Sequence, residues 1–431
     1  MNEADLVALG GFLALFAMMA ARVPVGIAMG LVGVGGFAAI AGWGPALNQL
    51  AISPLRTVTD YNTSLIPMFI LMGVFATRTG ISSELFRAGQ SWLGHFRGGL
   101  ALATISSCAG FAAISGSSVA TAATMSKVAL PEMKRAGYSD RLATGTIAGG
   151  GTLGILIPPS VVLAVYAYLT DQDVGKLFIA GVVPGLLAIV LYMLTVRFGF
   201  GRELPRGVRA SWADRWRSLA GIWAVALLFI AIIGGIYLGV VTPTEAAAAG
   251  AVLTALIGIL RGRLGWRAMR ECLVESLRTS VSIYVILIGA MLFGYFLAIT
   301  QTPQKITAWL TALDLGPYPT LALILVFFLL MGCILDAMAM IILLVPIVFP
   351  VVQQLGFDPI WFGIIIVMTV ELGLITPPIG MNAFVINAIA RDVSLLTIFR
   401  GVMPFVVVDL LRLVLLVALP GIVLWLPRTM G

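Results

Sequence analysis

Two copies of a glycine–proline motif are the part of this sequence best suited to ion binding. Gly154-Ile-Leu-Ile-Pro-Pro159 recurs as Gly373-Leu-Ile-Thr-Pro-Pro378, an offset of 219 residues from 154 to 373. Inside a helix, a proline costs ~3 kcal/mol and a glycine about 1 kcal/mol relative to alanine. Two successive prolines also leave carbonyl groups of the preceding turn without amide partners. The motif therefore predicts a broken helix whose free carbonyl oxygens can coordinate a hard cation.

Two further apolar segments are interrupted near their middle by small or polar residues. Residues 98–135 are interrupted at Ser115-Gly-Ser-Ser118, and residues 319–352 are interrupted between Gly332 and Asp336. Each arm is too short to span a membrane, which takes about 20 residues. Non-helical backbone at membrane depth is tolerated only where it is buried in protein or lines a watery cavity. We therefore expect two re-entrant hairpins that converge with the two broken helices on one cavity.

Such a cavity suits secondary transport of an anion with a cation. In secondary transporters, the N-termini of half-helices face anionic substrates, while unwound carbonyls bind sodium. The first hairpin offers hydroxyls at Ser117, Ser118, Thr121 and Thr124, and the hydroxyl of Thr376 adds an oxygen to the second break. The alternative is that both glycine–proline breaks are simple kinks, which are common in membrane helices.

Charged residues inside the membrane are costly and are candidates for function by default. Asp336 lies at the second hairpin tip, where we expect it to cap the returning arm rather than to carry a proton. For Glu371, the sequence does not distinguish orienting the second break from carrying a proton. Glu245 ends a capping box, Thr242-Pro-Thr-Glu245, and is expected to be structural. Asp409 and Arg412 are three residues apart on one helix face, so we expect them to pair.

The composition places these residues in an all-α polytopic membrane protein. The chain of 431 residues is 60% hydrophobic and 10% charged, and its mean hydropathy is +1.07, whereas about a quarter of the residues of a soluble domain are charged. The net charge of +7 fits basic cytoplasmic loops, so we expect no nucleic-acid partner. The sequence has no nucleotide-binding loop and no zinc-ligand spacing, and its three cysteines predict no disulfide framework. We expect neither an enzyme nor a cofactor, and ATP is not the expected energy source.

Each half of the chain is predicted to contain five membrane spans and one hairpin. The first repeat, residues 1–197, has spans near 6–21, 24–42, 63–77, 141–169 and 176–197. The second repeat, residues 218–431, has spans near 218–239, 243–260, 281–300, 359–390 and 401–426. Because five is an odd number, the second copy enters the membrane from the opposite side, which makes an inverted repeat. Residues 198–217 form the linker between the repeats.

The distribution of basic residues supports one orientation for this repeat. With the N-terminus outside, most of the 26 Lys and Arg residues fall in segments on the cytoplasmic side. The exceptions are Arg56, Lys176, Lys305 and Arg428 on the outside and Arg412 within the last span. The linker 198–217 is therefore expected in the cytoplasm. Residues 83–97 and 263–278 are amphipathic and occupy matching places in the repeats, so they are expected to lie along the membrane surface or to form solvated loops.

Taken together, these motifs resemble the large membrane subunit of the TRAP (tripartite ATP-independent periplasmic) transporters, the DctM-like family. The resemblance runs over nearly the full length of the chain. Its specific pieces are Ser115-Gly-Ser-Ser-Val-Ala-Thr121, Gly149-Gly-Gly-Thr-Leu-Gly-Ile-Leu-Ile-Pro-Pro-Ser160, Thr242-Pro-Thr-Glu-Ala246, Asp336 followed by an apolar arm to Pro346, and Gly373-Leu-Ile-Thr-Pro-Pro-Ile-Gly-Met-Asn382. In one departure, the family often has Asp-Pro at the second hairpin tip, whereas Ala337 follows Asp336 here. This departure predicts a more pliable tip.

The resemblance implies a sodium-driven importer of organic acids, of the carboxylate or dicarboxylate class, in the bacterial inner membrane. It also implies an elevator-type fold of the ion-transporter superfamily. Carried over by position, the sodium ligands are Ser115, Gly154, Ile157 and Pro159 in one site and Gly332, Leu335, Gly373, Thr376 and Ile379 in the other. The expected substrate contacts are Ser117, Ser118, Thr121, Ser160 and Asn382.

The implied partners are the lipid bilayer, a small four-helix membrane subunit and a periplasmic substrate-binding protein. We expect the small subunit to be a separate chain near residues 83–97 and 263–278, and the binding protein to touch the outer loops 43–62 and 301–318. Two alternatives remain open, namely a stand-alone sodium/anion symporter of related fold and a gated channel. A channel needs a continuous pore, whereas two re-entrant hairpins from opposite faces indicate alternating access.

Overall fold

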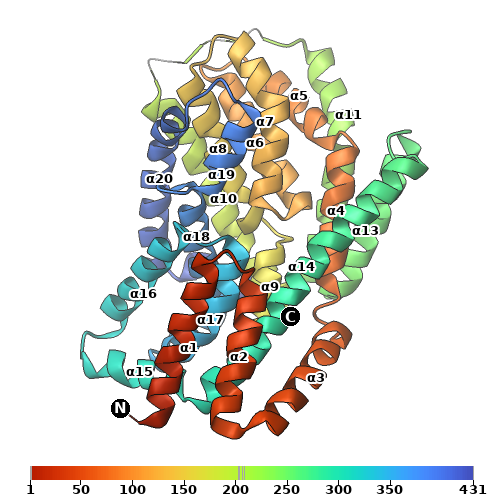
Figure 1. Cartoon of the computed structure of the whole chain (residues 1–431). Helices are drawn as coiled ribbons and strands as arrows, with labels where there is room; N and C mark the ends of the chain where they lie inside the picture. Colours follow the sequence, from red (N-terminus) through yellow and green to blue (C-terminus); the bar gives the residue numbers. More distant parts are fainter. Residues whose placement is uncertain (1, 202–203, 206, 208, 431) are drawn as a thin grey trace.

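A computed structural model describes residues 2–201, 204–205, 207 and 209–430, and this part of the chain is helical and contains no strand (Figure 1). The first half contains α1 (Glu3–Ala20), α2 (Val25–Ala41), α3 (Trp43–Thr59), α4 (Leu65–Arg78), α5 (Ile81–Leu93), α6 (Gly99–Ser115), α7 (Ser118–Arg135), α8 (Asp140–Leu156), α9 (Val161–Thr170) and α10 (Val174–Gly199).

The second half repeats this order. It contains α11 (Trp212–Phe229), the π-helical turn η1 (Ile230–Gly234), α12 (Gly235–Tyr237), α13 (Pro243–Leu260), α14 (Trp266–Ile299), α15 (Thr302–Ala312), α16 (Pro317–Gly332), α17 (Ala337–Gln354), α18 (Pro359–Ile375), α19 (Met381–Ile389), α20 (Leu395–Ala418), α21 (Gly421–Leu424) and the 3-10 turn η2 (Pro427–Thr429). Within the described residues, eight helices are long and apolar enough to cross a membrane, or nine if the bent pair α4–α5 counts as one span. The predicted class, an all-α polytopic membrane protein, is confirmed.

Both predicted hairpins and both predicted breaks are present. Helices α6 and α7 are joined at Gly116, whose φ of +59° is readily adopted by glycine, and α16 and α17 are joined by residues 333–336. The first broken helix stops at Leu156 and resumes at Val161 as α9. The second stops at Ile375 and resumes at Met381 as α19. The Pro158–Pro159 and Pro377–Pro378 peptide bonds are both cis. Local sequence was sufficient to predict where these helices end.

The core of the protein lies around α8 and α18. Every residue of α8 from Leu142 to Leu156 is buried, as is every residue of α18 from Trp361 to Ile375. Helix α8 packs against α6, α7, α20 and α18, and α18 also packs against α16 and α20. A second group of contacts joins α2 with α14 and α4 with α13. The molecule therefore contains a buried bundle around the broken helices and a group of long helices beside it (Figure 1).

The segments expected to be outer loops contain helices. Residues 43–62 form α3, and residues 301–318 include α15. Helix α3 buries Ala46, Ser53 and Thr57 along one side, while Trp43 and Leu55 on other sides are exposed. A one-sided pattern of this kind suits a helix that lies on a surface. The prediction of loops was wrong because these helices are too polar or too short to appear as membrane spans.

The two amphipathic stretches differ from one another in the structure. Residues 83–97 mostly belong to α5, which is separated from α4 by Gly80 at φ +75° and by a bend of 64°. From Trp266 onward, the stretch 263–278 instead runs without a break into the following span, so that α14 is one helix of 34 residues. No proline or left-handed residue interrupts α14, whereas Gly80 ends the α4 segment. The predicted correspondence of the two stretches is therefore wrong. At the offset of 219, residues 83–97 match 302–316, around α15, and residues 263–278 match 44–59, within α3.

The linker and the last span also differ from their predicted bounds. Helix α11 begins at Trp212, inside the predicted linker 198–217, because the Ser211 hydroxyl caps it by accepting a hydrogen bond from the Asp214 amide at 3.1 Å. Residues 202–203, 206 and 208 of that linker lie outside the described part of the chain. The span predicted at 401–426 ends at Ala418, just before Pro420. The predicted capping box is confirmed, since Thr242 and Glu245 exchange both hydrogen bonds, at 2.8 and 3.3 Å.

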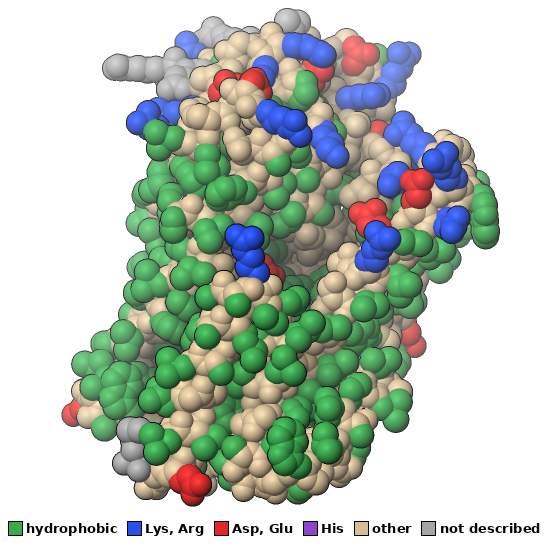
Figure 2. Space-filling view, viewed as in Figure 1, with side chains coloured by type: hydrophobic (Ala, Val, Ile, Leu, Met, Phe, Trp, Pro, Cys, Tyr) green, Lys and Arg blue, Asp and Glu red, His purple; other side chains and the backbone are tan. Residues whose placement is uncertain are grey.

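Two turns at equivalent positions share one backbone conformation. Gly137 follows the first hairpin and Gly356 follows the second, again at an offset of 219 from 137 to 356, and both have φ +79°. This agreement is expected if one unit was duplicated, which remains a prediction. The opposite orientation of the two units in a membrane remains a prediction. Basic side chains gather at one end of the molecule, the upper end in Figure 2, as the predicted orientation requires.

We expect cysteines placed beside these two turns to be labelled from opposite sides of the membrane. Ala136→Cys is expected to react with an impermeant maleimide from the cytoplasm, and Gln354→Cys from the outside, because an odd number of spans separates them. Both residues are exposed and neither is in the left-handed region. The background should have Cys108, Cys272 and Cys333 replaced by alanine. Labelling of both positions from the same side would rule out the inverted repeat.

Candidate functional site

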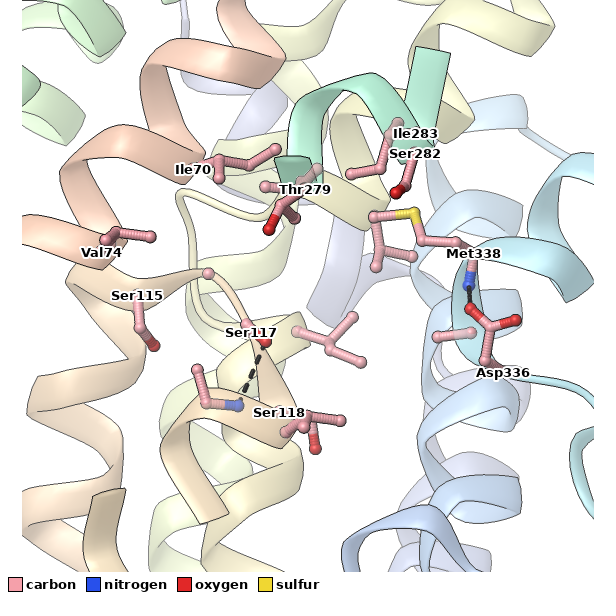
Figure 3. A pocket seen from close by; sticks show the side chains of 18 of the residues that line it. Ile70, Val74, Ser115, Ser117, Ser118, Thr279, Ser282, Ile283, Asp336 and Met338 are labelled. Carbon is pink, nitrogen blue, oxygen red and sulfur yellow. Dashed lines mark hydrogen bonds between the residues drawn. The ribbon is translucent and has the colours of Figure 1, made fainter. Parts of the chain in front are cut away.

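A cavity of about 670 Å³ lies where the two hairpin tips approach the long helices α4 and α14. Its lining includes Ser115, Ser117 and Ser118 from the first tip and Asp336 and Met338 from the second. Figure 3 shows the two tips on opposite sides of the space, with Thr279 and Ser282 of α14 between them. Figure 2 shows a recess in this face of the molecule. It lies beside the protruding end of α13 and α14, which carries several charged side chains. The predicted convergence of the hairpins on one cavity is therefore confirmed.

The first hairpin tip is held by hydroxyl groups. Ser117 is the N-cap of α7, and its side chain accepts a hydrogen bond from the Ala120 amide at 3.3 Å. The hydroxyls of Ser115 and Thr121 are 3.0 Å apart, and Thr121 also donates to the Ser117 carbonyl at 2.8 Å. The N-terminus of α7 therefore opens beside the cavity with its positive dipole end and unpaired amides. This arrangement suits an anionic ligand.

The first tip touches the first break through glycine backbone. A Cβ added to Gly154 would lie 2.5 Å from the Ser117 carbonyl oxygen. A Cβ added to Gly116 would lie 2.8 Å from the Pro159 carbonyl oxygen. Only glycine permits both approaches. The structure thus brings Ser115, Gly154 and Pro159 into one small region, with Ile157 in the break between the last two.

The second tip and the second break make a matching contact. A Cβ added to Gly373 would lie 2.7 Å from the Cα of Gly332. The Cys333 thiol lies 3.4 Å from the Pro377 carbonyl oxygen. Asp336 caps α17, as expected, by accepting from the Met338 amide at 3.2 Å. Carbonyl groups of the break and the tip are therefore close together in the second half, as they are in the first.

Thr376 keeps an oxygen available for a cation. Its hydroxyl donates to the Leu372 carbonyl at 2.5 Å, which leaves the hydroxyl lone pairs free to accept. The other predicted ligands of this site differ in exposure, since Leu335 is half-buried and Ile379 is 39% exposed. Of all nine predicted sodium ligands, only Ser115 lines the cavity. The expected ion sites therefore lie behind the hairpin tips and beside the cavity.

The predicted substrate contacts fall into two groups. Ser117 and Ser118 line the cavity, whereas Thr121, Ser160 and Asn382 are fully buried and do not line it. The Asn382 amide donates to the Ser118 hydroxyl at 2.7 Å, and its own carbonyl oxygen has no hydrogen-bond partner within the described residues. Ser160 caps α9 by accepting from the Leu163 amide at 3.3 Å. These three residues hold the tip and the break from outside the cavity lining, and their contact with the substrate remains a prediction.

The wall of the cavity that comes from α4 and α14 was not predicted from the sequence. Glu275, Arg278, Thr279 and Ser282 of α14 and Thr77 of α4 all line the cavity. Four of these five belong to one stretch, in which the amphipathic start of α14 passes into its apolar span. The available signal was the presence of polar residues inside the apolar part of a helix. Arg278 adds a positive charge to a cavity that also contains the carboxylates of Glu275 and Asp336.

Comparisons with known proteins show which family the chain resembles. The model of the family described as "Tripartite ATP-independent periplasmic transporter, DctM component" matches residues 12–422. The C4-dicarboxylate TRAP transporter large permease protein DctM of Pseudomonas aeruginosa is 40% identical, over 90% of this chain and 91% of that protein. The protein of the same name from Vibrio cholerae is 32% identical, over 96% of each chain.

A solved structure shows a similar fold. The YdaH transporter of Alcanivorax borkumensis, whose crystal structure has an unusual topology, has a TM-score of 0.66 and 18% sequence identity to this chain. The match covers 88% of this chain and 89% of that one. At this identity, the similarity concerns the fold alone.

Proposed function

Because this chain belongs to the DctM component family of the tripartite ATP-independent periplasmic transporters, we propose that it imports a C4-dicarboxylate or a related organic acid together with sodium. In this proposal it is a permease and not an enzyme. Its location is the bacterial cytoplasmic membrane. The observation that carries the proposal is the cavity between the two hairpin tips, since non-helical backbone meets there and hydroxyl and charged side chains contribute to a lining that is otherwise apolar.

The chemistry of the cavity suits a carboxylate. The hydroxyls of Ser117 and Ser118 accept hydrogen bonds and keep their protons to donate. The N-terminus of α7 adds a partial positive charge. The Arg278 guanidinium is a further donor on the opposite wall. Two carboxylates of one small molecule can thus meet donors from two different sides. Both relatives described above carry a C4-dicarboxylate in their names.

Sodium coupling is supported by the two breaks. Each break presents backbone carbonyls beside a hairpin tip, and oxygen ligands of this type suit sodium in discontinuous helices. The contacts of Gly154 with Ser117 and of Gly373 with Gly332 bring the break and the tip together in each half. Occupation of these sites by sodium would hold the tips in place, so that the substrate binds a preformed surface.

An elevator motion is supported by the division of the packing. We propose that the long helices α2, α4, α13 and α14 form the fixed part and that the hairpins and broken helices form the moving part. The two parts meet at small residues, because a Cβ added to Gly73 of α4 would lie 2.8 Å from the Ser115 carbonyl oxygen. The substrate cavity lies on this boundary. Sliding along the boundary would carry the cavity from one side of the membrane to the other.

Uptake measurements test this proposal. We expect proteoliposomes that contain the chain and its two proposed partners to accumulate radiolabelled succinate when sodium is higher outside. Accumulation above the external concentration would exclude a gated channel, which only equilibrates its substrate. Uptake of the same size with and without the sodium gradient would contradict sodium coupling.

Replacement of Thr376 by alanine is expected to weaken sodium activation. The loss of one ligand among several costs about 1–3 kcal/mol when a buried polar group loses its partner, and 1.4 kcal/mol corresponds to about tenfold. We therefore expect the half-saturating sodium concentration to rise by about tenfold. Thr369→Ala is a matched control, because Thr369 lies on the same helix and its hydroxyl also donates to the carbonyl four residues earlier. Equal sodium dependence in both variants would remove Thr376 from the site.

A further inference from the structure

Five buried polar side chains form a continuous network across the centre of the protein. The hydroxyls of Thr152 on α8 and Tyr192 on α10 are 2.9 Å apart, and Tyr192 donates to the Asp409 carboxylate on α20 at 2.6 Å. Arg412 lies 3.0 Å from Asp409, which confirms the predicted pair, and 3.5 Å from Glu371 on α18. All five side chains are at most 1% exposed. We call this set the inter-repeat network.

The ends of the network lie at equivalent places in the two repeats. Thr152 precedes Gly154 by two residues, and Glu371 precedes Gly373 by two residues, so the offset of the two breaks, from 152 to 371, also relates these side chains. Thr152 and Tyr192 belong to the first half, while Glu371, Asp409 and Arg412 belong to the second. The hydrogen bond between Tyr192 and Asp409 joins the two halves of the network.

Stability alone does not account for this arrangement. Buried charges cost several kcal/mol each in desolvation, and well-packed apolar residues are often at least as stabilising. The network is also incompletely satisfied, because one oxygen of Glu371 and two nitrogens of Arg412, Nε and Nη1, have no hydrogen-bond partner among the described residues. A buried ion pair costs free energy of folding, but it holds its two side chains in one orientation. The fixing of geometry therefore explains this network better than a gain in stability does. Its position directly before both breaks indicates which geometry it fixes.

We propose that the inter-repeat network positions the two broken helices relative to each other, so that the two breaks respond to ligand as one unit. Thr152 orients the end of α8 before Gly154, and Glu371 orients the end of α18 before Gly373. Tyr192 is the connecting residue, since its hydroxyl contacts both Thr152 and Asp409. These are positioning residues that touch neither ion nor substrate. The assignment of sodium to the breaks rests on the proposed function, whereas the coupling of the breaks does not.

The direct test is hydrogen–deuterium exchange of the two breaks in purified protein. Glu371→Gln lies in the second repeat, yet we expect it to raise the exchange of the first break, residues 154–164. Thr152→Val lies in the first repeat and is expected to raise the exchange of the second break, residues 373–384. Because α8 and α18 also pack directly against each other, the inference requires an effect on the opposite break that is larger than in the control variants. Thr146→Val and Thr369→Val are matched controls, because each removes a buried hydroxyl that donates to a carbonyl of its own helix.

The second readout is the sodium dependence of uptake in Tyr192→Phe. This variant keeps the ring, which packs edge-on against Phe405 at 5.4 Å, and removes the connecting hydroxyl. We expect the Hill coefficient for sodium to fall toward 1 and the half-saturating concentration to rise at least about fivefold, the lower end of typical site-to-site coupling.

The outcomes separate this inference from the sodium proposal. If hydrogen–deuterium exchange rises in the opposite break while uptake does not depend on sodium, the network is supported and sodium coupling is contradicted. If hydrogen–deuterium exchange rises only in the break of the mutated repeat, the network is overturned, even if sodium drives uptake. If Tyr192→Phe fails to fold, the exchange patterns of Thr152→Val and Glu371→Gln still decide between these outcomes.

Discussion

Replacement of Gly154 by alanine is expected to reduce uptake to near background. The added Cβ would lie 2.5 Å from the Ser117 carbonyl oxygen and 2.9 Å from the Ser118 amide nitrogen. Both contacts are with backbone, so no side-chain rotation can relieve them. The hairpin tip would have to move away from the break, and overpacking of this kind costs about 1–3 kcal/mol. Because Ser117 and Ser118 line the cavity, we expect uptake to fall by about tenfold to a hundredfold.

The equivalent change in the second half should have a similar effect. A Cβ on Gly373 would lie 2.7 Å from the Cα of Gly332. Gly294→Ala is the matched control, since Gly294 lies within α14 and a Cβ added there would meet no neighbouring element within 4 Å. That control should retain uptake, because alanine favours a helix more than glycine does. Uptake measured with succinate in proteoliposomes, at equal protein content, checks all three variants. Wild-type uptake by Gly154→Ala would show that the close approach of tip and break is not needed.

The second prediction is that this chain does not transport when it is reconstituted alone. Its cavity lies between helices, and we expect the capture of a dilute substrate to require a partner outside the membrane. We expect an external binding protein to deliver substrate by touching α3 and α15, which lie on the outer side in the predicted orientation. The affinity of the binding protein for this chain should be low, because the binding protein must dissociate after each delivery. Trp43 and Trp309 are exposed on these helices and are available for such contact.

A small membrane subunit is expected to cover part of the exposed apolar surface around α11. Trp212 and Trp216 of α11 are 62% and 64% exposed, although α11 packs beside α5. We therefore expect the subunit near α5, which contains most of the amphipathic stretch 83–97. Omission of either partner should lower succinate uptake to the level of empty liposomes. Robust sodium-driven uptake by the chain alone would favour the stand-alone symporter and leave the fold unaffected.

The positions of the breaks, the hairpins and the caps were determined by the sequence. Each depends on residues that act within one turn, such as the prolines after Gly154, the small residues around Gly116 and the carboxylate of Asp336. The pairing of Asp409 with Arg412 was predictable for the same reason, because residues three apart share a helix face. Local steric and hydrogen-bonding rules operate in any helix, so no knowledge of neighbouring elements was needed.

Which side chains face the cavity was decided only by the tertiary structure. Helices α8 and α18 are buried throughout most of their length, so their sequences carry no amphipathic pattern that indicates which face meets which neighbour. For this reason Thr121, Ser160 and Asn382 were expected at the substrate but do not line the cavity, while Arg278 and Thr279 of α14 line it and were not predicted. The contact of Glu371 with Arg412 spans 41 residues and depends on how α18 and α20 are rotated against each other. Rotation of uniformly apolar helices is set by side-chain packing between them, and no local pattern encodes it.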